Sequence, residues 1–360
     1  MTSPSHICSP EDPALADLCR RLAASADALD AAAAWPSEQL EACRQHGVFR
    51  WFVPPEFGGQ GWGEQELIQA YLRLSGACLA TTFVLTQPQG AARRIAASDN
   101  DELKARLLPG LAAGKALATV GISHLTTSRR HLAHPVLAAH ESGGAFTLDG
   151  TIPWVTGGAH ADYITIGATC DDGRQILAVL PTDLPGVAPQ PPANLVGLSS
   201  THTGEVRCQN VRLGGEWLLA GPVENVLSQA KGAGTGGAQT SALAIGLASA
   251  ALEFFEAEAE KRADLAPAAV SLREEHRRLE NDLFTLVAGA ATCSPEDLRA
   301  RANSFVLRSA QAALTAAKGS GYVSGHPAGR WCREALFFLV WSCPQPVAAA
   351  ALCELAGLSD

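Results

Sequence analysis

The sequence is poor in basic residues and carries no paired-cysteine motif. Its 360 residues include 27 Lys and Arg against 36 Asp and Glu, which gives a formal net charge of −9. This balance argues against nucleic acid as a partner, because phosphate binding needs a basic face. The ten cysteines include no CxxC pair, so their spacing predicts neither a zinc site nor a short disulfide framework. We therefore expect buried, reduced cysteines, no bound metal and a cytoplasmic protein.

The sequence also lacks the patterns of a membrane or secreted protein. It has no uninterrupted apolar run of the roughly 18 residues that a membrane span needs. The N-terminal residues show no basic segment followed by an apolar one, so we expect no membrane partner. Hydrophobic residues make up 47% of the chain, enough for a large core. A length of 360 residues predicts two or three domains.

Three stretches differ in the spacing of their apolar residues. The spacing is helical over 1–116, alternating over 117–220 and helical again over 221–360. Hairpin-type pairs mark turns in the middle stretch, at Gly143-Gly144, Asp149-Gly150 and Asp172-Gly173. Its last strand is expected at 204–213, and the last helix of the chain at 334–357. The predicted fold class is α+β: an N-terminal helical domain, a central antiparallel β domain and a C-terminal four-helix bundle.

Five motifs follow one another along the chain. They are "PSEQLEACRQHGVFRWFVPPEFGGQGWGEQEL", "LLPGLAAGKALATVGIS", "GTIPWVTGGAHADYITIGA", "GLSSTHTGEVRCQNVRLGGEWLLAG" and "GSGYVSGHPAGRWCREALFF". Together they resemble the acyl-CoA dehydrogenase family, in the family's order and at nearly its intervals. The resemblance implies that family's fold, an FAD cofactor and a homodimer or homotetramer. It also implies a small-molecule substrate, an acyl-CoA or another acyl thioester.

The resemblance places the flavin ring beside the third motif. Trp154 falls on the family's Trp that packs against the ring, and Thr156 falls on the Thr that hydrogen-bonds it. An aromatic wall and nearby donors tune a flavin's electron affinity. Without the motifs, Trp154 would be interpreted as filling a corner of the β domain. Ser123 keeps a hydroxyl at the family's turn beside the ring, where His124 and Leu125 replace an acid and a proline.

The resemblance places the other half of FAD on the C-terminal helices. Arg262 falls on the family's Arg that reaches a diphosphate from a neighbouring subunit, and a guanidinium suits phosphate oxygens. Alternatively, Arg262 is a solvated surface charge beside Lys261. Gly319 and Gly321 fall near a glycine pair whose bare backbone approaches the adenosine. Alternatively, the two glycines form a helix C-cap, a role that is compatible with contact to the adenosine.

The family's catalytic base has no counterpart. The family removes a proton alpha to a thioester, and in most members a Glu does so from the position that falls on Ser342. A smaller group places the Glu just before an Arg on the first bundle helix, where this chain has Gly236 and Gly237. A neutral Ser is no general base at pH 7 without a helper. His124 is an alternative base, since His titrates near neutrality, but it also fits a hydrogen-bonded residue at a domain junction.

The leading function is an FAD-dependent oxidoreductase acting on an acyl thioester or a related small molecule, with the usual Glu replaced. Two alternatives stay open. One is a flavin-dependent oxidase or monooxygenase on the same fold, in which reduced flavin reacts with oxygen and needs no Glu. The other is a catalytically inactive subunit of a hetero-oligomer. The catalytic residue is left unassigned.

Overall fold

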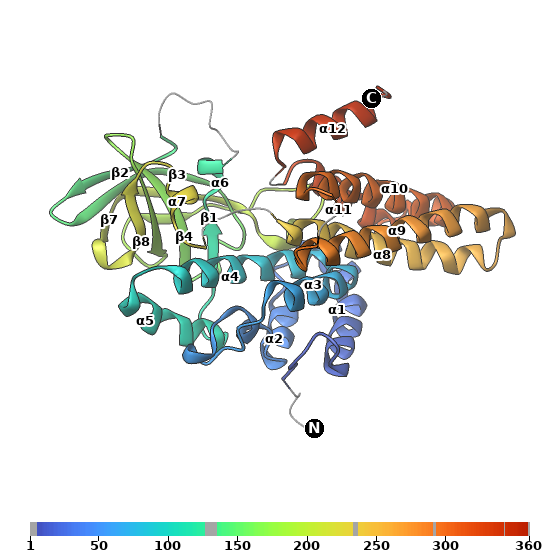
Figure 1. Cartoon of the computed structure of the whole chain (residues 1–360), viewed down its shortest axis with the longest axis horizontal. Helices are drawn as coiled ribbons and strands as arrows, with labels where there is room; N and C mark the ends of the chain where they lie inside the picture. The colour runs from blue at the N-terminus through green and yellow to red at the C-terminus, as the bar shows by residue number, and fades with distance from the viewer. Residues whose placement is uncertain (1–5, 127–134, 233–236, 291–292, 342, 359–360) are drawn as a thin grey trace.

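The computed structural model describes residues 6–126, 135–232, 237–290, 293–341 and 343–358. Helices come first in the chain, a β-sheet follows, and a second set of helices ends it (Figure 1). This arrangement confirms the predicted fold class. Figure 1 shows the sheet at one side of the molecule and the long C-terminal helices at the other.

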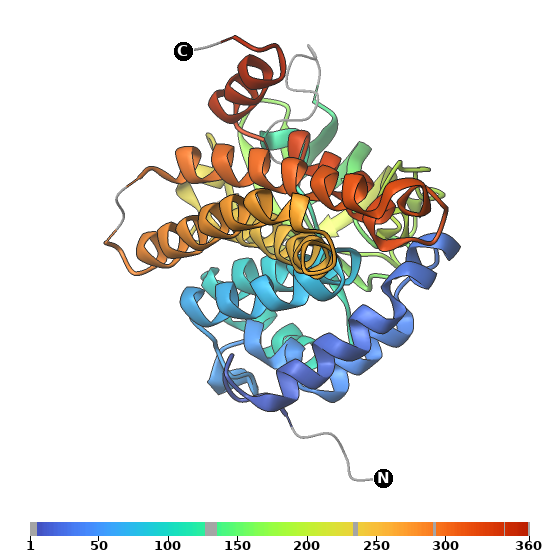
Figure 2. The same cartoon turned by 90° about the vertical axis from the view of Figure 1, so that its right-hand side faces the viewer.

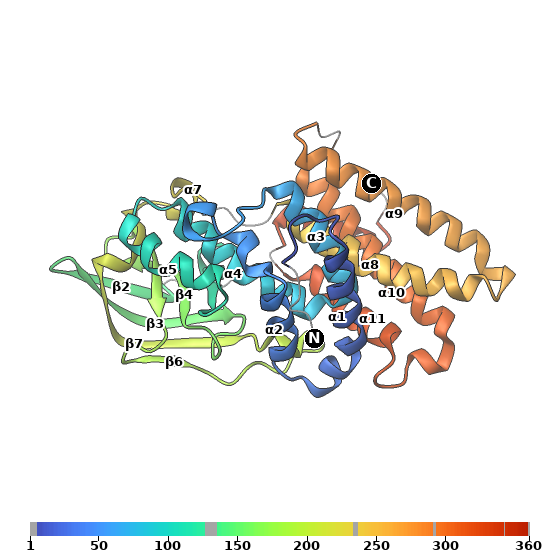
Figure 3. The same ribbon diagram turned by 90° about the horizontal axis from the view of Figure 1, so that it is seen from below.

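The first part consists of α-helices joined by short turns of 3-10 helix. These elements are α1 (Pro13–Ala32), α2 (Ser37–Gln45), η1 (Val48–Phe52), η2 (Pro55–Phe57), α3 (Glu64–Ala77), α4 (Leu79–Ala97) and α5 (Asp101–Ala112). Asp12 caps α1 by accepting a hydrogen bond from the backbone N–H of Ala14, with Pro13 at the first helical position. Seen from below, α4 and α5 lie over the sheet, while α1 and α3 lie over the C-terminal helices (Figure 3).

The second part is a sheet in the order β6-β7-β3-β2-β4-β5-β8, with β1 paired to β4. Its strands are β1 (Ala118–Gly121), β2 (Leu137–Ser142), β3 (Ala145–Val155), β4 (Tyr163–Cys170), β5 (Gln175–Pro181), β6 (Val187–Pro189), β7 (Gly204–Gly214) and β8 (Leu218–Val223). Short helical turns join them: α6 (Ser123–Thr126), η3 (Ser199–Thr201), η4 (Gly215–Trp217) and α7 (Val226–Gln229). Most pairs are antiparallel, but β1 and β2 both pair parallel with β4.

Two details of the sheet differ from the sequence prediction. Asp149-Gly150 is not a turn, because β3 continues through it with a shift in its register against β7. Gly150 has φ of +130°, and a Cβ there would lie 2.3 Å from the carbonyl oxygen of Val136. The glycine therefore permits a β-bulge in β3 and the close approach of the Val136 backbone. Trp217 does not follow the last strand, since β8 begins directly after it and pairs with β5.

The third part is a set of long helices with shorter ones at its end. They are α8 (Ala238–Ala259), η5 (Ala263–Leu265), α9 (Ala266–Val287), α10 (Pro295–Gly321), α11 (Pro327–Ala335), η6 (Leu336–Leu339) and α12 (Gln345–Leu355). The single helix expected over 334–357 is wrong. After α11 the chain forms the 3-10 helix η6. A separate helix, α12, then begins, with Pro344 at its N-cap. A proline removes a helical hydrogen bond, so an uninterrupted helix was unfavourable there.

Helix α8 lies between α3 and α10 (Figure 2). Its contact with α3 is close: a Cβ on Gly246 would lie 2.0 Å from the hydroxyl oxygen of Ser75. Among the described helices, α8 alone is long and apolar enough by length and composition to cross a membrane, but 72% of that window is buried in the protein. Leu243, Leu247 and Leu252 are among its buried residues, so α8 is a core helix of the protein.

Candidate functional site

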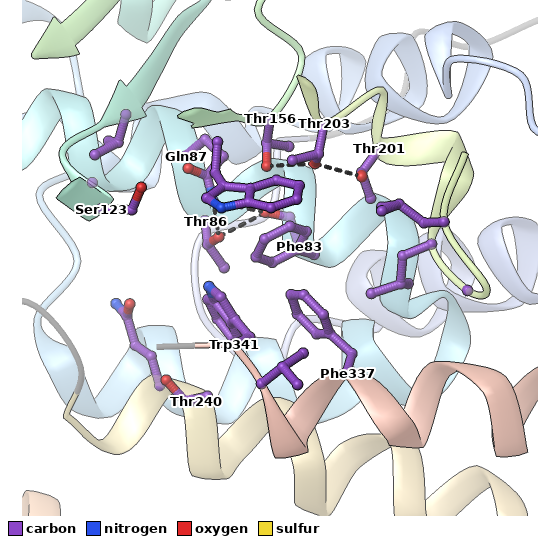
Figure 4. Close-up of a pocket in the computed structure, with 18 of the residues that line it drawn as sticks. Phe83, Thr86, Gln87, Ser123, Thr156, Thr201, Thr203, Thr240, Phe337 and Trp341 are labelled. Atoms are coloured by element: carbon purple, nitrogen blue, oxygen red, sulfur yellow. Dashed lines mark hydrogen bonds between the residues drawn. The ribbon is translucent and has the colours of Figure 1, made fainter. Parts of the chain in front are cut away.

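A cavity of about 780 Å³ lies where the three parts of the chain meet (Figure 4). Its walls come from α4, the end of β1, the turn after β3, the loop before β7, the start of α8 and the segment around η6. Its aromatic lining is Phe83, Trp154, Phe337 and Trp341, and its hydroxyl lining is Thr86, Ser123, Thr126, Thr156, Thr201, Thr203 and Thr240. A cavity of this size suits a cofactor or a drug-sized ligand.

Trp154 reaches the cavity because β3 is irregular near its end. The register against β7 shifts between Ile152 and Val155, both of which are fully buried. Trp154 lies between them and is 48% exposed, so its indole does not fill a corner of the core. A half-exposed Trp lining a cavity is a surface on which a flat ligand can stack.

The turn after β3 is held by a chain of hydroxyl groups, drawn in Figure 4. The Oγ1 atoms of Thr156 and Thr203 are 2.9 Å apart, and those of Thr203 and Thr201 are 2.8 Å apart. Thr119 donates a hydrogen bond to the carbonyl oxygen of Thr156 at 2.7 Å. Gly157 follows with φ of +64°, and a Cβ there would lie 2.5 Å from the ring of Trp35. Glycine is required at this position for both reasons.

Three aromatic rings form one side of the cavity, and we call them the aromatic floor: Phe83, Phe337 and Trp341. Phe337 and Trp341 stack with their centroids 5.1 Å apart, and Phe83 meets both edge-on at 4.9 and 4.8 Å. Figure 4 shows the three together below the threonine chain. Such edge-to-face contacts are favourable beyond their buried area, so the floor is a fixed surface.

A buried arginine behind the aromatic floor fixes its backbone. Arg299 donates to the carbonyl oxygen of Trp341 at 3.0 Å and to Asn303 at 2.9 Å. The amide of Asn303 donates in turn to the carbonyl oxygen of Phe338 at 2.8 Å. Burial lowers the pKa of Arg299 to about 10, so it remains a cation at neutral pH. The segment that ends beside Ser342 is therefore held by charged hydrogen bonds.

The cavity is cationic. Arg93, Arg94 and Arg333 line it, and its described lining includes no Asp, Glu, His, Cys, Lys or Tyr. Arg333 is paired with Asp30 of α1 at 2.6 Å. No general base is therefore present among the described lining residues. Ser342 and Gly236, where the family resemblance places that base, lie outside the residues that the structure describes.

The structure brings three of the predicted cofactor residues to this cavity and keeps the others away. Ser123, Trp154 and Thr156 line it. The hydroxyl oxygen of Ser123 is buried with no hydrogen-bond partner among the described residues, so it is available to a ligand. His124 is buried beside the cavity wall without lining it, and its Nε2 lies 2.8 Å from the carbonyl oxygen of Gly167.

The remaining predicted cofactor residues lie together at the end of the helical bundle. Arg262 follows α8, whose 22 residues span about 33 Å from the cavity at its N-terminal end. Arg262 donates to the carbonyl oxygen of Ala316 at 2.7 Å and lies 3.6 Å from Glu258. Gly319 and Gly321 occupy the last turn of α10. These three residues do not line the cavity of their own chain.

Glu334 forms a structural ion pair within α11. It lies 3.1 Å from Arg330, and both side chains are buried. Arg330 also donates to Asp27 of α1 at 2.7 Å. Burial raises the pKa of Glu334, and the guanidinium of Arg330 opposes that rise. The contact between Arg330 and Asp27 joins α11 to α1, and Glu334 does not line the cavity.

The sequence matches known proteins over part of their length. Residues 12–115 match the family model of the acyl-CoA dehydrogenase N-terminal domain. YngJ, a probable acyl-CoA dehydrogenase of Bacillus subtilis strain 168, is 24% identical over 250 residues, which cover 68% of this chain and 65% of that protein. The (2S)-methylsuccinyl-CoA dehydrogenase of Cereibacter sphaeroides is 28% identical over 242 residues, which cover 63% of this chain and 44% of that protein.

The three-dimensional likeness extends over almost the whole chain. The butyryl-CoA dehydrogenase of Megasphaera elsdenii superposes with a TM-score of 0.80 over 96% of this chain and 97% of its own, at 17% identity. At this identity the likeness shows the fold, while the family model and the curated relatives add the sequence match. On these grounds, residues 12–115 belong to the acyl-CoA dehydrogenase N-terminal domain family, and the chain as a whole has the acyl-CoA dehydrogenase fold.

Proposed function

We propose that the chain is an FAD-dependent oxidoreductase that acts on an acyl thioester or a related small molecule. One observation carries the proposal: Trp154 is half-exposed in a cavity that Ser123 and Thr156 also line. An aromatic face with hydroxyl groups around it fits an isoalloxazine ring, which has two flat faces and polar edges. Flavins occur in solved structures of the same fold, FADH2 in one and FMN in another.

In this proposal each residue has a separate task. Trp154 packs against one face of the ring, and the hydroxyls of Ser123 and Thr156 hydrogen-bond its polar edge. The unpartnered Ser123 oxygen supports this assignment, because a buried polar atom without a partner is costly. Bound FAD would supply the hydride-accepting chemistry. The aromatic floor would exclude water from the substrate beside it.

The second half of FAD would lie on a neighbouring subunit. Arg262, Gly319 and Gly321 do not line the cavity of their own chain, and Arg262 follows the far end of α8, a helix about 33 Å long that begins at the cavity. A homodimer or homotetramer would bring one chain's Arg262 to another chain's cavity. The phosphates of FAD suit a guanidinium fork.

A second candidate is a flavin-dependent oxidase or monooxygenase. The observation in its favour is the described cavity lining, which offers no carboxylate and no histidine as a base. A reaction between reduced flavin and oxygen does not require that base. The same observation is compatible with a catalytically inactive partner subunit. The oxidase or monooxygenase differs from the other two candidates in what the reduced, flavin-loaded protein does on exposure to air.

The absorption spectrum of the purified protein, with and without added FAD, tests the proposal. We expect bound flavin, released by acid or heat because it is held without a covalent bond. Photoreduction followed by air then separates the candidates: rapid reoxidation favours the oxidase, and persistence of reduced flavin favours the dehydrogenase. A folded protein that takes up no FAD at tens of micromolar, a range that weak specific ligands reach, would overturn the proposal.

A further inference from the structure

Two buried side chains on helices that border the cavity carry uncharged hydrogen-bonding groups. Gln89 of α4 is 6% exposed and Thr240 in the first turn of α8 is 3% exposed, and both line the cavity. The two helices contact each other. Figure 4 shows Thr240 on the opposite side of the cavity from Thr156 and Thr203. Thr240 is therefore separate from the chain of hydroxyl groups that holds the turn after β3.

The described part of the chain gives neither side chain a hydrogen-bond partner. No described residue bonds the amide of Gln89 or the hydroxyl of Thr240. Thr86, on the same helix as Gln89, shows the contrast: it donates to the carbonyl oxygen of Phe83 at 2.6 Å and accepts from Gln87 at 2.9 Å. Because most buried polar side chains have a partner, an amide and a hydroxyl that face a cavity without one are available to a ligand.

The chemistry of the two side chains selects an uncharged ligand group that both donates and accepts. A glutamine amide does both, and so does a threonine hydroxyl. A ligand hydroxyl satisfies either group, whereas a methyl group placed against it leaves it without a partner and displaces water without replacing its hydrogen bonds. A site built to bond a substrate hydroxyl discriminates strongly against the analogue that lacks it.

The two side chains come from a different part of the fold than the residues proposed to hold the flavin ring. Those residues belong to the sheet and to the turns beside it. Gln89 and Thr240 belong to helices, and Gln89 lies about 9 Å along α4 from Phe83 of the aromatic floor. This position fits the acyl chain of a substrate that packs on the floor.

We propose that Gln89 and Thr240 are specificity-determining residues that hydrogen-bond a hydroxyl group on the acyl chain of the substrate. The substrate class is then a hydroxyacyl thioester. This inference rests on the proposed function for the thioester, but the hydroxyl site itself does not depend on bound flavin. The ribityl hydroxyls of FAD share this chemistry, so the experiment must separate the two sources.

Three matched pairs of thioesters test the hydroxyl. They are the N-acetylcysteamine thioesters of 3-hydroxybutyrate and 3-methylbutyrate, of 4-hydroxypentanoate and 4-methylpentanoate, and of 5-hydroxyhexanoate and 5-methylhexanoate. Each pair exchanges a hydroxyl for a methyl group at one carbon. Anaerobic calorimetric titration measures their binding to FAD-free and FAD-loaded protein. We expect the wild type to bind the hydroxyl member of at least one pair about ten-fold more tightly.

Matched variants assign that preference to the two side chains. Thr240→Val keeps the shape of the side chain without its hydroxyl, and Gln89→Met keeps the length without the amide. Each should reduce the preference, and the double variant should abolish it. Thr315→Val and Gln209→Met make the same exchanges at exposed positions and should leave it unchanged. Far-UV circular dichroism checks folding, and the affinity of each variant for FAD is measured separately.

The outcomes decide between the substrate and the cofactor. A wild type that binds no thioester, or that prefers the hydroxyl member of no pair, would overturn the inference even if FAD binds. So would a double variant that keeps the preference, and its loss of FAD affinity would then assign the two side chains to the cofactor. A hydroxyl preference in a protein that binds no FAD would support the inference while the proposed flavin function fails.

Discussion

At the scale of single residues, Trp154 and Trp217 provide a matched comparison. Trp154 is half-exposed in the cavity, whereas Trp217 packs beneath the guanidinium of Arg106 at 4.0 Å and beside Tyr163. We predict that Trp154→Ala weakens FAD binding about ten-fold, because a stacked aromatic face contributes on the order of 1 kcal/mol beyond its buried area. Trp217→Ala should change FAD affinity far less. Titration of flavin-free protein with FAD, followed by fluorescence, measures both.

Both variants must keep the wild-type circular dichroism spectrum for this comparison to hold. Trp217→Ala removes a packing contact of the sheet, so it is expected to lower stability without changing the cavity. Equal FAD affinity in the two folded variants would remove Trp154 from the cofactor site.

At the residue level, a local motif indicated which side chains come together, while their cofactor roles stay predictions. The third motif placed Trp154 and Thr156 two residues apart at the end of a strand, and the structure has both at the cavity. Arg94 carried no such signal. Its spacing from Phe83 and Gly90 shows that the three share a helix face, but only the packing of α4 against β1 shows that this face lines a cavity.

At the scale of elements, the prediction was wrong where two features of the sequence favoured different structures. Asp149-Gly150 has the composition of a hairpin turn, yet pairing of β3 with both β2 and β7 carries the strand through it. The 334–357 segment has helical spacing, but Pro344 interrupts it, and two rings of the aromatic floor, Phe337 and Trp341, lie before that break. The proline was visible in the sequence, whereas the packing of Trp341 was not.

A histidine pair links the turn after β3 to η3, and it predicts a pH dependence of stability. His202 donates from Nε2 to the carbonyl oxygen of Ala33, so its Nδ1 accepts from Nε2 of His160 at 2.9 Å. Burial, and then the charge of His202, lower the pKa of His160 below its unfolded value near 6.5. The unfolded chain therefore binds protons first as pH falls, and stability present at pH 7.5 should be lost towards pH 5.5.

Unfolding midpoints in urea at pH 7.5 and 5.5 measure that loss. His160→Gln should reduce it, because a glutamine amide can still donate a hydrogen bond to Nδ1 of His202 but does not titrate. His140→Gln is the control with the opposite sign: Asp171 raises the pKa of His140, so His140 contributes stability at low pH. Removing it should enlarge the loss on acidification. A wild-type loss that His160→Gln leaves unchanged would contradict the role of the pair.

At the scale of the whole molecule, the order of the three parts was predictable because each part has its own apolar spacing and its own motifs. The meeting point of the parts was not predictable from spacing, since α4, the loop before β7 and the segment around η6 are far apart in sequence. The cavity is a product of their packing. The separation of Arg262 from it follows from the length of α8, which the sequence did indicate.

The last prediction concerns the reaction of the complete, flavin-loaded protein. We expect butyryl-CoA to bleach the flavin very slowly under anaerobic conditions, because the described cavity lining holds no carboxylate or histidine to remove the alpha proton. General-base catalysis typically contributes about 10²- to 10⁴-fold, so its loss leaves little turnover even when ester and flavin both bind. Ser342→Glu restores an acid at the family's base position, next to Trp341 in the cavity wall, and should speed bleaching. Ser228→Glu adds the same charge at an exposed position and should not. Fast bleaching by the wild type would show that another residue acts as the base, and His124, buried beside the cavity wall, would be the first to replace.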